Sequence, residues 1–166
     1  MSNAIVRRDE FARTGKTEED VVAPEELITE LRRTLPSVLE HHPIRLAYLY
    51  GSAATGKVTP FSDTDLALIV QDGLTPLECL KLILHIQVDL ADCCDIPNAD
   101  VRIVNDAPLI FRGRVICDGI LVYARDEQKR VEFEAGTRMR YFDYLLVHQR
   151  LQEAFFASLR ERGLYG

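Results

Sequence analysis

The sequence predicts a small mixed α/β domain in which helices pack against a mainly four-stranded sheet. The chain has 166 residues, of which 47% are hydrophobic and 28% charged, as is typical of a soluble protein with one core. Short apolar runs rich in β-branched residues alternate with longer segments whose apolar residues recur at helical spacing. The last segment, residues 127–162, contains no proline and one glycine, which favours a long C-terminal helix.

The predicted elements follow in the order helix, two strands, helix, strand, helix, strand and long helix. Their expected positions are a helix from Pro24 to about Leu39, strands at Arg45–Tyr50 and Leu66–Val70, a helix at Thr75–Ala91, a strand at Asp100–Val104, a helix ending near Gly119, a strand at Ile120–Tyr123 and a helix at Glu127–Arg162. The apolar residues of the helix at 75–91 are numerous enough to predict burial on more than one side.

Local signals refine the ends of these helices. Pro36 should kink the first helix or begin a second short one. Thr75 and Glu78 have the spacing of a capping box, and Asn105–Asp106 is expected to cap the helix that follows it. Gly136 is a possible break in the last helix.

Composition excludes several classes of protein. The 26 acidic and 20 basic side chains give a net charge of -6 without a basic run, which argues against direct nucleic-acid binding. The four cysteines, at positions 79, 93, 94 and 117, lack zinc-finger spacing, and no apolar run approaches the roughly 20 residues that cross a membrane. We therefore expect a cytoplasmic protein with a flexible N-terminal arm at residues 1–22 and one domain at 23–166.

The candidate site lies between the first two predicted strands. Gly51-Ser52-Ala-Ala-Thr-Gly56 follows one strand, and Ser62-Asp63-Thr-Asp65-Leu leads into the next. Gly51 permits a tight turn with close backbone approach to a ligand, and the Ser52 hydroxyl and neighbouring N–H groups suit phosphate oxygens. Asp63 and Asp65 are two residues apart in extended chain, so their carboxylates should project from one face.

Asp100 opens the third predicted strand. If that strand lies beside the one that carries Asp63 and Asp65, its carboxylate completes a triad. Carboxylate oxygens are the ligands that Mg²⁺ prefers, and two such ions can hold the attacking and leaving oxygens of a phosphoryl transfer. The alternative is that Asp100 simply begins its strand.

Taken together, these motifs resemble the nucleotidyltransferase superfamily that includes DNA polymerase β. The match is closer to its minimal nucleotidyltransferase branch, the MntA-type antitoxins, where Gly-Ser-x-Ala-x-Gly precedes Ser-Asp-x-Asp-Leu. Thr55 departs from the arginine often found there. The resemblance implies a nucleotidyltransferase fold over roughly residues 25–150.

This resemblance also implies the chemistry. Gly51, Ser52 and Ser62 would bind the nucleotide, and Asp63, Asp65 and Asp100 would be both catalytic residues and Mg²⁺ ligands. The reaction would transfer AMP from ATP to a tyrosine hydroxyl of a cognate HEPN-domain toxin, so that the chain acts as an antitoxin. Two alternatives remain open: a small-molecule nucleotidyltransferase of the aminoglycoside type, and a non-catalytic module that neutralises a toxin by occlusion.

Overall fold

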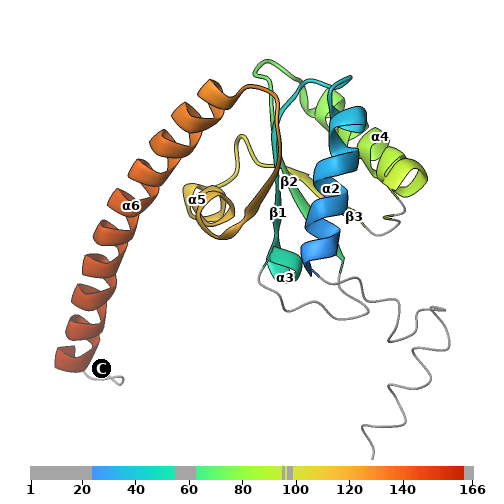
Figure 1. Ribbon diagram of the computed structural model, residues 1–166. Helices are drawn as coiled ribbons and strands as arrows, with labels where there is room; N and C mark the ends of the chain where they lie inside the picture. The colour runs from blue at the N-terminus through green and yellow to red at the C-terminus, as the bar shows by residue number, and fades with distance from the viewer. Residues whose placement is uncertain (1–23, 55–62, 95, 97–98, 163–166) are drawn as a thin grey trace, which may run out of the picture.

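The computed structural model describes residues 24–54, 63–94, 96 and 99–162 (Figure 1). The elements are α2 (Pro24–Leu39), β1 (Ile44–Tyr50), α3 (Gly51–Ala54), β2 (Thr64–Val70), α4 (Pro76–Cys94), β3 (Ala99–Ile103), α5 (Leu109–Asp118), β4 (Ile120–Ala124) and α6 (Glu127–Arg162). The predicted order of helices and strands is confirmed, with the short helix α3 added at the glycine turn. The expected N-terminal arm lies outside the described residues.

The four strands form one mixed sheet in the order β3-β2-β1-β4. Strand β1 is antiparallel to β2 and β4, whereas β2 and β3 are parallel and are joined by the crossover helix α4. This confirms the predicted α/β class and the four-stranded sheet. Because of these directions, the end of β1 and the beginnings of β2 and β3 lie at the same edge of the sheet.

Helices cover both faces of the sheet (Figure 1). Helices α2 and α4 pack on one face, where Leu35, Ile86 and Leu90 belong to the larger apolar core. Helix α5 and the first part of α6 pack on the other face, where a smaller core contains Tyr48 and Ile116. Both faces of the central strands are therefore buried, which agrees with their nearly continuous apolar sequences.

Of the two outcomes expected at Pro36, the second short helix does not form, because α2 continues through that residue, and the kink stays a prediction. A proline inside a helix removes one backbone hydrogen bond, and here the last turn is held instead by packing. Leu35 and Leu39 are fully buried in the larger core, and Val38 is nearly so. Helix α6 likewise runs without a break through Gly136.

The two predicted caps have different outcomes. At α4 the capping box is confirmed, because the Thr75 N–H donates to the Glu78 carboxylate and the Glu78 N–H donates to the Thr75 hydroxyl. At α5 the prediction is wrong, since the helix begins after Pro108 without a side-chain cap. Asn105 instead joins β2: its amide oxygen accepts from the Val70 N–H and its amide nitrogen donates to the Val70 carbonyl, both at 2.9 Å.

Helix α4 buries one side, not more than one as predicted. Leu82, Ile86, Leu90 and Cys94 form its buried stripe. Ile83 is partly buried against the same core, whereas four other large apolar side chains of the helix are more than half exposed, namely Leu77, Leu80, Leu84 and Val88. The sheet and α2 lie along a single side of α4. The number of apolar residues in this helix therefore predicted more burial than the structure has.

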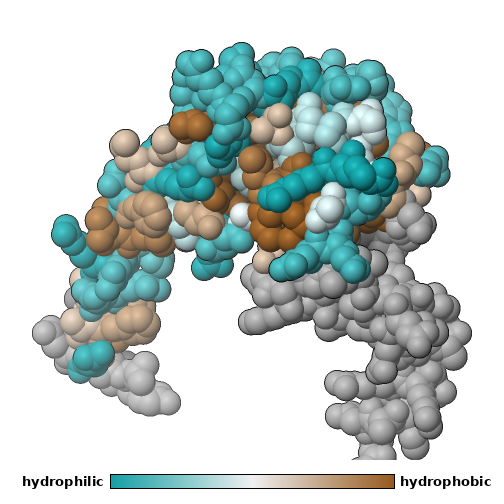
Figure 2. Space-filling model, in the orientation of Figure 1, coloured by the Kyte–Doolittle hydropathy of each residue, from teal (hydrophilic) through white to brown (hydrophobic). Residues whose placement is uncertain are grey.

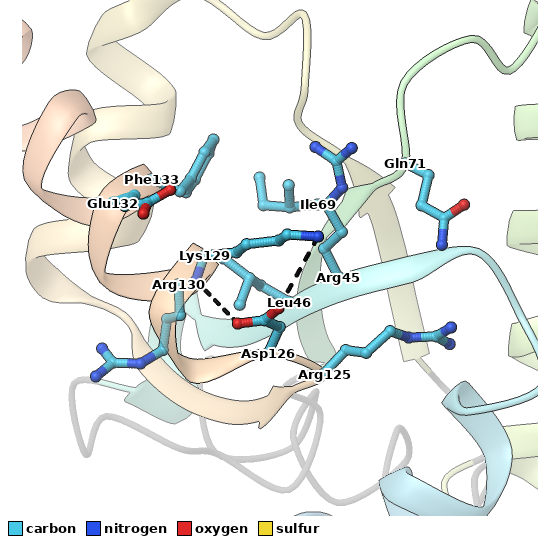
Figure 3. Close-up of a pocket in the computed structure, with 10 residues that line it drawn as sticks. All are labelled: Arg45, Leu46, Ile69, Gln71, Arg125, Asp126, Lys129, Arg130, Glu132 and Phe133. Carbon is cyan, nitrogen blue, oxygen red and sulfur yellow. Dashed lines mark hydrogen bonds and ion pairs between the residues drawn. The ribbon is translucent and has the colours of Figure 1, made fainter.

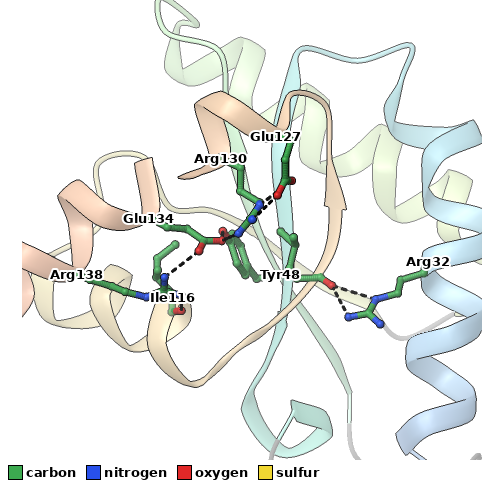
Figure 4. Close-up of polar contacts among 8 residues, drawn as sticks. Arg32, Tyr48, Ile116, Glu127, Arg130, Glu134 and Arg138 are labelled. Carbon is green, nitrogen blue, oxygen red and sulfur yellow. Dashed lines mark hydrogen bonds and ion pairs between the residues drawn. The ribbon is translucent and has the colours of Figure 1, made fainter. Parts of the chain in front are cut away.

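A buried polar cluster attaches α6 to the sheet (Figure 4). The Tyr48 hydroxyl on β1 donates to the Glu134 carboxylate at 2.7 Å, and Arg130 donates to the same oxygen at 2.8 Å. Arg138 pairs with the other Glu134 oxygen at 3.0 Å and also donates to the Ile116 carbonyl of α5. Glu134 is thus the point at which β1, α5 and α6 are joined.

Beyond this cluster, α6 extends away from the sheet (Figure 1). Figure 2 shows apolar patches along this helix. Its side chains that are more than half exposed include Met139, Phe142, Leu146, Val147, Leu151, Phe155 and Phe156. Among the described helices, none has the length and apolar character needed to cross a membrane.

Candidate active site

Gly51, at the turn after β1, lies against the Asp65 carboxylate. Gly51 follows β1 directly and has a φ of +72°, in the left-handed region that side chains disfavour. A Cβ atom placed on Gly51 would overlap the Asp65 carboxylate. Glycine is therefore required at this position for two independent reasons, the backbone conformation and the close approach of Asp65.

We expect Gly51→Ala to destabilise the protein by about 1–3 kcal/mol, because alanine strains the left-handed backbone and displaces the Asp65 side chain. Gly136→Ala is the matched control, since a Cβ atom there meets nothing within 4 Å and alanine favours a helix. Thermal unfolding of both variants checks the prediction. An unchanged Tm for Gly51→Ala would contradict it.

Sheet pairing brings Asp65 and Asp100 side by side. The parallel register of β2 and β3 places Asp65 opposite Asp100, and the antiparallel register of β1 and β2 places Tyr50 opposite Asp65. The adjacency that the sequence left open is therefore present. Neighbouring strands lie about 4.8 Å apart, so the two carboxylates share one face at close range.

This juxtaposition has an electrostatic consequence. Burial, together with the negative charge of Asp100, raises the pKa of Asp65, and the positive charge of Arg102 opposes that increase. Asp63 adds a smaller repulsion. A cation near Asp65 would relieve this repulsion, since opposite charge favours an ionised carboxylate.

Arg102 is a member of the site that the sequence reasoning missed. Its Nε and Nη2 atoms donate to the same Asp100 oxygen at 3.0 and 2.7 Å. Its hydrogen bond to Asp100 raises the pKa of Arg102 further above its already high value. Residues two apart on a strand share a face, so the position of Arg102 in the predicted strand was a usable signal.

Two aromatic side chains, Tyr50 and Phe111, lie near these charged residues. The ring of Tyr50 meets that of Phe111 on α5 edge to face, with centroids 5.6 Å apart. A cavity of about 240 Å³ adjoins Gly51 and is lined also by both aromatic rings and by Arg114. Burial raises the pKa of the Tyr50 hydroxyl, Arg102 opposes the increase, and Asp65 adds to it.

The predicted site also includes Asp63, Ser52 and Ser62. Asp63 is exposed and immediately precedes β2, and Ser52 lies in α3. Ser62 lies outside the described residues, as does Gly56. Among the residues that the structure describes, no three carboxylate, imidazole or thiol side chains gather closely enough to form a metal site. The pair formed by Asp65 and Asp100 is therefore the centre of the site.

A larger cavity, of about 830 Å³, lies at the opposite end of the sheet (Figure 3). It is lined by Arg45, Arg125, Lys129 and Arg130 over an apolar floor of Leu46, Ile69 and Phe133. Three of these cations have partners within the chain. Arg45 pairs with Asp72, and Arg130 pairs with Glu127 and Glu134. Arg125 donates hydrogen bonds to backbone carbonyls. The cavity is separate from the carboxylate site.

A mixed four-stranded sheet with paired carboxylates beside a glycine turn is the layout of a nucleotidyltransferase fold. The family model described as polymerase beta nucleotidyltransferase matches residues 33–128. That match covers more than half of the chain and includes every described residue of the site. The chain belongs to the polymerase beta nucleotidyltransferase family.

Solved structures of toxin–antitoxin systems share the fold. One chain, from a toxin–antitoxin crystal structure with AMP-PNP, is 21% identical, with 81% of this chain and 99% of that chain covered and a TM-score of 0.54. A second, from a structure of tri-AMPylated Shewanella oneidensis HEPN toxin in complex with MNT antitoxin, is 18% identical, with coverages of 78% and 98% and a TM-score of 0.55. No curated protein is a significant match to the sequence.

Proposed function

We propose that this chain is a Mg²⁺-dependent nucleotidyltransferase that transfers AMP from ATP to a hydroxyl group. The observation that carries the proposal is the placement of Asp65 directly opposite Asp100 beside the Gly51 turn. Membership of the polymerase beta nucleotidyltransferase family supports the reaction class.

The donor set fits Mg²⁺. Asp65 and Asp100 offer carboxylate oxygens, and burial and mutual repulsion raise the pKa of Asp65, so that a cation would stabilise its ionised form. Asp63, two residues before Asp65 in the chain, would be the third carboxylate once its side chain turned toward the metal. When bound, Mg²⁺ would neutralise charge on the phosphate oxygens.

Each residue of the site has a proposed role in the transfer. Gly51 and Ser52 would hold the nucleotide phosphates, Ser62 would bind the nucleotide, and Asp63 and Asp65 would bind the metal. Asp100 would also bind metal and would accept the proton of the attacking hydroxyl. The hydroxyl oxygen forms a bond to the α-phosphorus, the bond from that phosphorus to the β-phosphate oxygen breaks, and pyrophosphate leaves. Positioning and charge neutralisation account for most of the catalysis in such transfers.

We propose a tyrosine of a HEPN-domain toxin as the acceptor, which would make the chain an antitoxin. Two observations support this choice. The fold is shared with a chain from the structure of an AMPylated HEPN toxin bound to its MNT antitoxin. The far half of α6 exposes apolar side chains, and exposed apolar patches commonly mark protein–protein contacts.

The same apolar helix favours a second candidate function. A module that only occludes a toxin would need the α6 surface and not the carboxylates. The two candidates differ in what the substitution of a carboxylate does to toxin neutralisation, which gives a direct way to separate them.

The test uses ATP labelled at the α-phosphate, Mg²⁺ and the product of the adjacent gene as the candidate toxin. We expect label on the toxin, and its loss with Asp63→Asn or Asp100→Asn. Asp72→Asn is the matched control, because Asp72 is exposed and pairs with Arg45 at the other end of the sheet. Absence of label with the unsubstituted chain would refute protein adenylylation. Neutralisation by the Asp100→Asn variant would favour occlusion.

A further inference from the structure

We propose that Arg102 is a substrate-binding residue that is held in reserve on Asp100 and transfers to the nucleotide triphosphate when Asp100 takes up metal. This inference rests on the proposed nucleotidyltransferase function. It assigns a role to a residue outside the Gly-Ser and Asp-x-Asp motifs.

Arg102 lies on the same face of the sheet as Asp65 and Asp100. It follows Asp100 by two residues on β3, so both side chains share the face that carries Asp65. The residue opposite Arg102 on β2 is Ala67, whose methyl group occupies little space on that face. The charge of Arg102 acts on Asp65 and Tyr50 as well as on Asp100. Its guanidinium group is therefore central to the site.

The contact between Arg102 and Asp100 is easily broken. The Arg102 side chain is 59% exposed and that of Asp100 is 37% exposed. Ion pairs of this exposure contribute little to stability, because water solvates both partners when they separate. A structural clamp would be expected to be more deeply buried, as the Glu134 cluster is.

Competition for Asp100 follows from the geometry. Both hydrogen bonds from Arg102 end on one Asp100 oxygen, Oδ2. A metal ion held by Asp100 would repel this guanidinium group, since both are positively charged. The guanidinium group would then be available to an anionic triphosphate, and its planar donors suit phosphate oxygens.

The proposal predicts opposite effects of Arg102→Gln on two affinities. Removal of the competing cation should strengthen binding of Mn²⁺ alone, by about threefold or more, in a titration followed by electron paramagnetic resonance. Removal of a charge-assisted phosphate contact should weaken binding of AMP-PNP at saturating Mn²⁺ by about tenfold. A purely structural ion pair would not move the two affinities in opposite directions.

Arg45→Gln is the matched control, since Arg45 pairs with Asp72 at the far end of the sheet and its loss changes the net charge equally. We expect both affinities of that variant to equal those of the unsubstituted chain. Arg102→Lys keeps the charge without the planar fork and should restore part of the AMP-PNP affinity.

The outcomes distinguish this inference from the proposed function. If the unsubstituted chain binds Mn²⁺, Asp65→Asn does not, and Arg102→Gln matches the unsubstituted chain in both titrations, then only the role of Arg102 is refuted. If the unsubstituted chain binds neither Mn²⁺ nor AMP-PNP, the proposed function and the role of Arg102 are refuted together.

Discussion

Asp65→Asn is expected to reduce nucleotidyl transfer by on the order of 10²–10³-fold and, at the same time, to stabilise the fold at neutral pH. The loss follows from the proposed role of Asp65 in binding metal beside Asp100. The gain follows because burial and the Asp100 charge raise the pKa of Asp65, so its ionised form is less stable in the folded protein than in water. Neutral asparagine removes this penalty while keeping the shape.

With screening by solvent allowed for, the gain should be up to about 1 kcal/mol, which corresponds to a rise in Tm of about 2–4 °C. A group whose pKa is raised on folding destabilises the folded state at high pH, so the difference between the variant and the unsubstituted chain should shrink as the pH falls through the pKa of Asp65. Asp72→Asn, at an exposed position, should change neither activity nor Tm. A fall in Tm for Asp65→Asn would contradict the electrostatic explanation.

Glu134→Ala should destabilise the protein by about 3 kcal/mol and lower its Tm by about 10 °C. The substitution leaves the Tyr48 hydroxyl without its acceptor and removes the carboxylate that Arg130 and Arg138 share. Glu132→Ala is the control, because Glu132 is exposed two residues away on the same helix. Comparable Tm losses for both variants would show that the buried cluster has no special role.

The same cluster predicts a dependence on pH. Burial alone would raise the pKa of Glu134, but the hydrogen bonds from Tyr48 and Arg130 outweigh it, so the pKa falls below the ordinary value of 4.5. A carboxyl whose pKa is lowered on folding stabilises the fold above its unfolded pKa, and this contribution disappears as the pH falls below about 4.5. Denaturant titrations from pH 7 to pH 3 should show a smaller loss of stability for Glu134→Ala than for the unsubstituted chain.

Much of the fold could be predicted because its elements are encoded locally. The apolar runs of β1 and β2, the helical spacing in α2 and the capping box of α4 are all visible within short windows of sequence. The errors arose where tertiary contacts override local signals. Asn105 bonds to β2 instead of capping α5, and only one side of α4 packs against the sheet and α2.

The candidate site could be predicted in part, for a related reason. Gly51 and Asp65 lie near each other in the chain, so a motif joins them. Asp100 is 35 residues beyond Asp65, and only the sheet register makes them neighbours. Arg102 has no motif of its own, and its importance becomes apparent once its hydrogen bonds to Asp100 are seen.

The parallel pairing of β2 with β3 also makes the site sensitive to insertion. Side chains alternate between the two faces of a strand, so a slip of one residue in β3 would turn Asp100 toward the larger core beneath α2 and α4 and bring a neighbouring apolar residue to the face of Asp65. An added residue within β3 would shift the side chains that follow it to the opposite face. The spacing of the carboxylates is thus maintained by the whole sheet, and a change in chain length far from Asp65 can abolish the pair without altering either aspartate.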